Sequence, residues 1–340
     1  MTAASIQNLA PFTGLNHTYA AVASGDTVVN DGKDAATGLP VISLYTEKRA
    51  PSKEDLEDLD VLVFDIQDVG VRYYTYSSTL GLAIEAAKGS GKKFLVLDRP
   101  NPIGGITVSG PVRDQDQEAF IAYHTVPLRH GMTLGELALL YNAERRIQAD
   151  LDVVKCQGWT REMAYDRTGL LWVNPSPNMR NLVEAFLYPG VGWLEATNLA
   201  TGRGTDTPFE RLGAPWIDPV AFSNALNASG VKGVRFTPIW FSPTERQYKG
   251  ERCGGVQIMI TQLDELDPVA MGVRLATTLR ALYPNDWKPE GLLKLLCHRR
   301  AYQAIVDGKS APQVEALWQA DLQRFKLVRM NYLLYERGDR

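Results

Sequence analysis

The stretch Val61-Leu-Val-Phe-Asp-Ile-Gln-Asp-Val-Gly-Val-Arg-Tyr-Tyr-Thr-Tyr76 decides the fold of the first half of this chain. Its first residues are β-branched or aromatic, which is typical of a strand buried on both faces, as in a parallel sheet, and we expect that strand over 59–65. Two carboxylates and an amide follow it. Because ligands bind beyond the carboxyl ends of strands in open α/β sheets, these groups predict a ligand site. A single Asp would more often cap a helix, but capping does not explain the whole polar and aromatic run.

A second strand of the same kind is expected at 93–97, after a helix over 77–88. Strand, helix and strand form a βαβ unit, so the two strands are expected to be parallel and adjacent, or one strand apart. The residues at their carboxyl ends would then share one rim: Asp65, Asp68, Asp98, Arg99 and Asn101. We therefore expect an α/β protein with a mostly parallel sheet in residues 1–150 and a second domain in residues 151–340.

Composition narrows the classes of function. The chain has 340 residues, a net charge of −3 and no long basic run, which argues against nucleic acid as the partner. No apolar stretch reaches the roughly 20 residues that a membrane span needs. The start lacks the features of a signal peptide, so a cytoplasmic protein is expected as written, and a periplasmic or extracellular one if the N-terminus is truncated.

No cofactor or metal ion is expected. The sequence has no GxGxxG and no P-loop, the two glycine patterns that bind nucleotide phosphates. Its 3 cysteines and 4 histidines show neither CxxC nor HExxH spacing. Glu136 stands three residues after Thr133, so it is expected to complete a capping box and not to be catalytic.

Two loops of the second half combine polar groups with aromatic ones. Trp172-Val-Asn-Pro-Ser-Pro-Asn-Met179 is stiff and presents amides and a hydroxyl beside an indole, a combination that suits a sugar. In Glu195-Ala-Thr-Asn-Leu-Ala-Thr-Gly-Arg-Gly-Thr205, a glycine-flanked arginine lies among hydroxyl groups. Such an arginine can clamp a carboxylate or phosphate, and a surface salt bridge is the alternative for Arg203.

These two loops, the stretch 63–76 and the segments 97–105 and 129–136 resemble successive blocks of one bacterial family, the exo-β-N-acetylmuramidases of the NamZ type. The resemblance runs from about Asp31 to the C-terminus. It implies a Rossmann-like first domain, a smaller α/β second domain and an active-site cleft between them. It also implies a glycosidase of cell-wall recycling that releases N-acetylmuramic acid from the non-reducing end of peptidoglycan fragments, with a saccharide or muropeptide as its partner. Oligomeric state is left open.

The beginning of the chain departs from the family pattern. Members usually carry a Pro-Glu-His-Gly motif after an additional strand and helix, and its Glu is the leading catalytic candidate. Here Ala10-Pro-Phe-Thr-Gly14 matches best, so Phe12 and Thr13 stand where Glu and His are usual, and the first βα unit is not found. We therefore expect a truncated or diverged member, and a catalytically impaired saccharide-binding protein is the alternative function.

The candidate site residues follow from both arguments. Glycosidases commonly use two carboxyls, so we expect catalysis by Glu195, Asp65 and Asp68, with Glu195 as the general acid. Arg72 or Arg203 is expected to hold the lactyl carboxylate of muramic acid. The predicted substrate-binding residues are Gln67, Arg72, Tyr74, Tyr76, Asp98, Asn101, Asn174, Ser176, Asn178, Asn198, Arg203 and Thr205.

Overall fold

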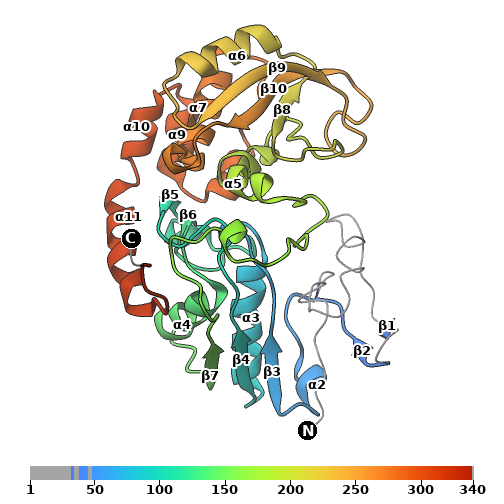
Figure 1. Ribbon diagram of the computed structural model, residues 1–340, viewed down its shortest axis with the longest axis vertical. Helices are drawn as coiled ribbons and strands as arrows, with labels where there is room; N and C mark the ends of the chain where they lie inside the picture. Colours follow the sequence, from blue (N-terminus) through green and yellow to red (C-terminus); the bar gives the residue numbers. More distant parts are fainter. Residues whose placement is uncertain (1–31, 34–37, 45–47, 339–340) are drawn as a thin grey trace. The chain divides into compact units, whose positions relative to one another are not determined.

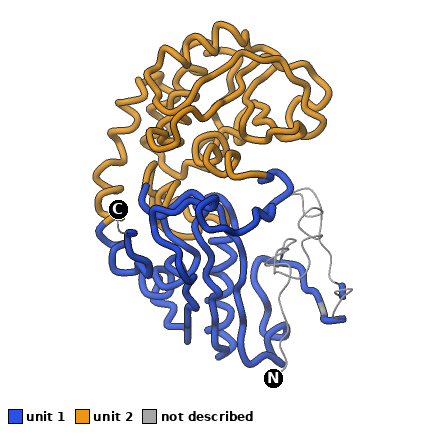
Figure 2. The backbone as a smooth tube through the Cα atoms, in the orientation of Figure 1, with its two compact units in different colours: residues 1–107, 131–180, 327–340 blue, residues 108–130, 181–326 orange. Residues whose placement is uncertain are grey.

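The computed structural model describes residues 32–33, 38–44 and 48–338 (Figure 1). The expectation for Phe12 and Thr13 lies outside them. The chain divides into two compact units, 1–107 with 131–180 and 327–340, and 108–130 with 181–326 (Figure 2). Both units are assembled from segments that are distant in the sequence. The domain boundary expected at residue 150 refers to domains that fold independently. A division into compact units does not test independent folding, so this boundary stays a prediction.

The first unit contains the predicted parallel sheet. Strands β3 (Val61–Phe64), β4 (Lys93–Leu97) and β7 (Leu151–Val154) pair in the order β3-β4-β7, and both pairings are parallel. Helix α3 (Tyr76–Gly89) connects β3 to β4, and α4 (Leu134–Glu144) precedes β7. The α/β class and the adjacency of the first two strands are thereby confirmed. The expectation of burial on both faces is wrong for β3, because Val63 is 43% exposed at the end of the described sheet.

Local capping sets the starts of the helices in this unit. Ser52 begins α2 (Lys53–Leu56), and its hydroxyl accepts from the Asp55 amide. Thr133 begins α4 with a full capping box, in which Glu136 accepts from the Thr133 amide, as the sequence predicts. A short antiparallel pair, β1 (Gly32–Lys33) and β2 (Pro40–Val41), precedes them.

The second unit is built on antiparallel strands. Strands β8 (Arg211–Ala214), β10 (Cys253–Ile260) and β9 (Val234–Phe241) pair in the order β8-β10-β9, and β5 (Ser109–Val112) pairs with β6 (Pro127–Arg129). Helix α6 (Pro219–Ala228) packs on β9 and β10. The other helices are α5 (Leu182–Val191), α7 (Pro268–Leu282), α8 (Leu292–Leu296), α9 (Arg299–Val306), α10 (Ala311–Ala316) and α11 (Gln319–Arg329). The 3₁₀ turns of this unit are η2 (Gln115–Gln117), η4 (Gly192–Ala196) and η5 (Leu263–Glu265), whereas η3 (Tyr165–Arg167) and η6 (Met330–Tyr332) belong to the first unit. In the described part of the chain, no helix is long and apolar enough to cross a membrane.

Helices α5 and α7 approach so closely that only glycine fits at their contact. A Cβ at Gly190 would lie 1.9 Å from the carbonyl oxygen of Pro268, and a Cβ at Gly272 would lie 2.3 Å from the carbonyl oxygen of Gly190. Both obstacles are backbone atoms, which cannot move aside as a side chain can. The two helices are therefore held in contact backbone to backbone.

Gly190→Ala is expected to lower the free energy of unfolding by about 1–3 kcal/mol, because the added methyl forces α5 and α7 apart. Gly89→Ala is the matched control, since Gly89 also lies in a helix and a Cβ there meets nothing within 4 Å. The control should be neutral or stabilising by about 0.5 kcal/mol. Urea unfolding measures both, and equal midpoints for the two variants would contradict the packing argument.

Candidate functional site

A small cavity of about 10 Å³ lies where the parallel strands of the first unit end. The loop after β3, the loop after β4 and the start of α4 all contribute to its walls. The carboxyl ends of both predicted strands therefore meet at one cavity. The described residues that line it are Ile66, Gln67, Asp68, Gly70, Arg99, Pro100, Asn101, Met132, Thr133 and Leu134.

Asp68 is the buried acid of this cavity. Asp68 is 6% exposed, and its Oδ2 accepts a hydrogen bond of 2.7 Å from the Gly70 amide. Its Oδ1 is also buried but has no hydrogen-bond partner in the described part of the chain. Burial raises the pKa of Asp68 to about 7, against the lowering effect of the Gly70 and Val69 amides. Asp68 can therefore hold a proton near neutral pH and give it to a ligand.

Gln67 and Asn101 tie the walls of the cavity together. The Gln67 amide donates to the carbonyl oxygens of Asp68 (2.8 Å) and Pro100 (3.0 Å), which joins the loops after β3 and β4. The Asn101 amide donates to the carbonyl of Met132 at 2.9 Å. Gly70 has φ +78°, and a Cβ there would lie 2.5 Å from Asn101 Oδ1, so glycine is required. The Gln67 and Asn101 side chains therefore stabilise the loops that form the walls of the cavity.

Asp98 and Asp65, unlike Asp68, accept hydrogen bonds from side chains. Asp98 Oδ1 accepts from the amides of Gly135 (2.8 Å) and Arg99 (3.0 Å). Its Oδ2 accepts from the hydroxyls of Thr133 and Tyr335, both at 2.6 Å. Burial raises the pKa of Asp98, and these hydrogen bonds oppose that effect. Asp65 Oδ1 accepts from Arg99 Nε at 2.6 Å in an ion pair. Neither carboxyl is among the described residues that line the cavity.

The arginine and tyrosines that follow Asp68 in the sequence are buried inside the first unit. Arg72 is 1% exposed, Tyr74 is 9% and Tyr76 is 5%. The two tyrosine rings meet edge to face at 5.0 Å, and the Tyr76 hydroxyl donates to the carbonyl of Pro175 at 2.8 Å. This bond connects the start of α3 to the Pro-rich loop, which the Trp172 indole closes by donating to the Met179 carbonyl.

Three predicted polar residues lie in that loop. Asn174 and Ser176 are half-buried, whereas Asn178 is 5% exposed. The Oδ1 of Asn178 is buried and has no partner in the described residues. An amide oxygen in that state is available to a ligand donor, so Asn178 stays a candidate for binding.

In the second unit, Glu195 forms a bidentate ion pair. Arg203 donates from Nε to Oε1 and from Nη2 to Oε2, the latter at 3.1 Å, and the Thr201 hydroxyl adds a third bond of 3.1 Å to Oε1. The guanidinium lies 5.0 Å from the centre of the Phe209 ring. Both oxygens of the Glu195 carboxyl thus accept hydrogen bonds from the guanidinium, the geometry of a strong charge-assisted pair. The geometry therefore favours an electrostatic role for Glu195 over the expected role of general acid.

Asn198 and Thr205 shape the same region of the second unit. Asn198 donates to the Asp286 carbonyl at 2.8 Å and accepts from the Lys288 amide at 2.7 Å. The Thr205 hydroxyl donates to the Gly202 carbonyl at 2.6 Å and accepts from the Thr207 amide. These contacts hold loops in place, and ligand binding by the two residues stays a prediction.

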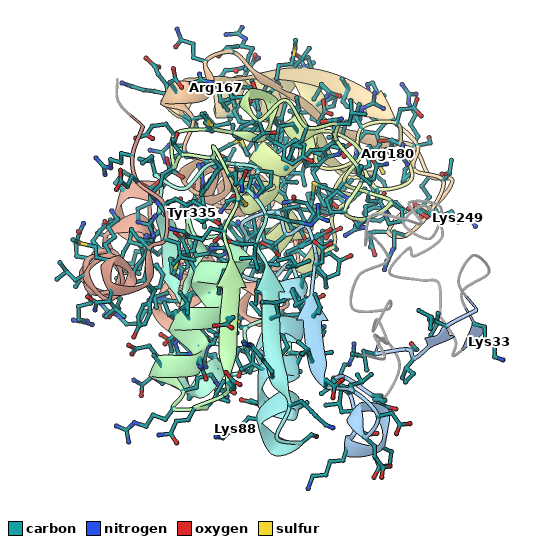
Figure 3. All side chains as sticks on the ribbon, turned by 60° about the horizontal axis from the view of Figure 1, so that its bottom comes forward. Lys33, Lys88, Arg167, Arg180, Lys249 and Tyr335 are labelled. Carbon is teal, nitrogen blue, oxygen red and sulfur yellow. The ribbon has the colours of Figure 1, made fainter. Side chains whose placement is uncertain are left out.

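Sequence reasoning missed two supports of the strand ends. One is Tyr335 near the C-terminus, which is labelled in Figure 3. Its hydroxyl donates to Asp98, and the centre of its ring lies 4.8 Å from that of Trp159. The other is Arg161, which pairs with the fully buried Glu136 at 2.5 Å. No local pattern identifies either residue, because each is far in sequence from its partner. Among the described residues, no group of three or more His, Cys, Asp or Glu could hold a metal ion.

Comparison with known proteins gives consistent matches over nearly the whole chain. The family models of the exo-beta-N-acetylmuramidase NamZ match twice, the N-terminal model over residues 1–183 and the C-terminal model over residues 186–335. The peptidoglycan beta-N-acetylmuramidase NamZ of Bacillus subtilis (strain 168) is 42% identical over 305 residues, which are 89% of this chain and 74% of that protein.

Two crystal structures of DUF1343 family proteins from Bacteroides fragilis share the fold. One has a TM-score of 0.78 at 35% sequence identity, and the other a TM-score of 0.72 at 30% identity. Each alignment covers 90% of this chain and 82% of the other. At these levels of identity the likeness extends to sequence as well as to fold.

The burial of Asp68 predicts a pH dependence of stability. Its pKa is about 7 when folded and near the ordinary 3.8 when unfolded, so the folded state holds the extra proton between these values. Stability is then full below pH 4 and falls as the pH rises to 7, by a loss on the order of 4 kcal/mol. Asp68→Asn lacks this titration and should show a flatter curve.

Urea unfolding between pH 4 and pH 8 measures the difference. Asp60→Asn is the control, because Asp60 is an exposed carboxyl directly before β3. The control should keep the slope of the wild type. Parallel curves for the wild type and Asp68→Asn would mean that Asp68 is not held neutral by the fold.

Proposed function

Because this chain belongs to the family of the exo-β-N-acetylmuramidases of the NamZ type, we propose that it is a peptidoglycan hydrolase that releases N-acetylmuramic acid from the non-reducing end of glycan fragments. The observation that carries a hydrolytic role is the buried Asp68 carboxyl at the ends of the parallel strands, whose Oδ1 has no hydrogen-bond partner among the described residues.

Asp68 is proposed as the general acid. A catalytic acid works best when its pKa lies near the working pH, and burial brings the pKa of Asp68 to about 7. Its proton would pass to the glycosidic oxygen as the bond from that oxygen to the anomeric carbon breaks. The departing sugar then leaves as a neutral alcohol while positive charge develops at the anomeric carbon. Water adds to that carbon and gives a proton back to Asp68, which yields N-acetylmuramic acid and restores the acid.

The developing charge needs a negative group nearby. Asp65 forms an ion pair with Arg99, in which its Oδ1 accepts from the guanidinium at 2.6 Å. This pairing suits electrostatic stabilisation rather than proton transfer. The acetamido oxygen of the substrate can take the same part in substrate-assisted enzymes. Glu195, the third predicted catalytic residue, is likewise paired with an arginine, Arg203, and we keep it as a candidate on that ground.

Two substrates separate the acid role from a structural one. A disaccharide of N-acetylmuramic acid and N-acetylglucosamine has a poor leaving group and needs the acid. In the para-nitrophenyl glycoside of N-acetylmuramic acid, the leaving group is para-nitrophenolate, which departs without being protonated. Asp68→Asn should lower the rate on the disaccharide by about 10²–10⁴-fold and on the para-nitrophenyl glycoside far less.

Asp60→Asn serves again as the control and should leave both rates unchanged. An equal loss on both substrates would show that Asp68 supports the fold of the site and is not the acid. Absence of turnover by the wild type on either substrate would refute the hydrolase proposal and favour a saccharide-binding protein, which calorimetry with N-acetylmuramic acid would detect.

A further inference from the structure

We propose that Arg99 is the residue that recognises the lactyl carboxylate of N-acetylmuramic acid. The inference rests on the proposed function and deepens it, because this carboxylate distinguishes muramic acid from N-acetylglucosamine. The sequence assigned that task to Arg72 or Arg203. The contacts of the three arginines favour Arg99.

Arg99 presents an unused part of its guanidinium to the cavity. It follows β4 directly and lines the cavity described above. Its Nε contacts the carboxylate of Asp65 at 2.6 Å. In the part of the chain that the structure describes, its two terminal amino groups make no hydrogen bond. Asp65 thereby fixes the plane of the guanidinium while two donors stay available, the arrangement that a bidentate carboxylate requires.

The other two arginines are less accessible. Arg72 is 1% exposed, so its guanidinium is enclosed by the first unit. Arg203 already spends Nε and Nη2 on the two oxygens of Glu195. Either would have to give up its present surroundings to bind a ligand. Arg99, with a side chain that is 32% exposed, needs no such rearrangement.

The charge balance of the cavity also suits an anion. Of the described residues that line it, only Arg99 and Asp68 have ionisable side chains. Burial holds the Asp68 carboxyl neutral up to about pH 7, and Arg99 is not among the groups that shift its pKa. The Arg99 charge is therefore offset only in part, by Asp65 on its Nε side. A carboxylate on the opposite side would complete the pairing.

The cavity is too small to enclose a sugar ring. Its volume of about 10 Å³ is about that of one water-sized probe. A charged substituent of the sugar, rather than a whole ring, is therefore the part that would contact the residues lining it. A single N-acetylmuramic acid residue carries both groups, the lactyl ether on C3 and the glycosidic oxygen on C1. One cavity can thus offer Arg99 to the first and Asp68 to the second.

A purely structural salt bridge with Asp65 is the competing explanation. Pairs of this exposure contribute about 0–1 kcal/mol to stability, so such a role would affect folding slightly and sugar preference not at all. The two explanations therefore differ in what they predict for binding. Affinity for the charged and the uncharged sugar separates them.

Isothermal titration tests the proposal with three probes: N-acetylmuramic acid, its methyl ester and N-acetylglucosamine. The wild type should bind the acid about 10- to 100-fold more tightly than the other two, as expected for charge-assisted hydrogen bonds. Arg99→Gln should lower the affinity for the acid by the same factor and leave the other affinities unchanged. Arg99→Lys keeps the positive charge but cannot donate two parallel hydrogen bonds, so its affinity for the acid should lie between those of the wild type and Arg99→Gln.

Lys88→Gln is the matched control. It removes a positive charge from an exposed residue near the end of α3 and should change no affinity (Figure 3). A preference for the acid that survives in Arg99→Gln would overturn the inference, and so would equal binding of the acid and its methyl ester by the wild type, a comparison that needs no variant. If the preference depends on Arg99 but the disaccharide is not hydrolysed, the hydrolase proposal fails and the assignment of Arg99 stands.

Discussion

The first unit depends on the carboxylate of Asp98. Four donors satisfy it: two backbone amides and the hydroxyls of Thr133 and Tyr335. A buried carboxylate is costly unless it is hydrogen-bonded in this way. The four donors come from the end of β4, the start of α4 and the C-terminal segment, so one side chain fixes three segments. The loop after β4 and the start of α4, both tied to Asp98, form two walls of the cavity.

Three carboxyls at the strand ends have different environments, and the environment decides what each can do. Asp98 is saturated with donors and serves the structure. Asp65 forms an ion pair with one guanidinium. Asp68 has one oxygen hydrogen-bonded and the other without a partner among the described residues, and burial brings its pKa to about 7. Pairs of acids whose surroundings separate their protonation states are the usual basis of acid–base chemistry at one site.

Much of the fold follows from local pattern. The strands after residue 60 and residue 92, the helix between them and the capping box at Thr133 are all found where the sequence predicts them. Strand and helix periodicity and capping act over a few residues, which is why they can be recognised in a single sequence. The antiparallel sheet of the second unit was not predicted, because its pairings join strands such as β8 and β10 that lie far apart in the chain.

The sequence by itself determined which polar residues stand at the ends of the parallel strands, since that depends only on where each strand stops. Tertiary structure alone decided their states. Arg99 reaches Asp65 across 34 positions, and Tyr335 reaches Asp98 across 237. It also paired Glu195 with Arg203, where the sequence suggested an acid at the first and left a clamp or a salt bridge open at the second. Protonation and pairing depend on burial and on partners brought together by the fold, and no local pattern records them.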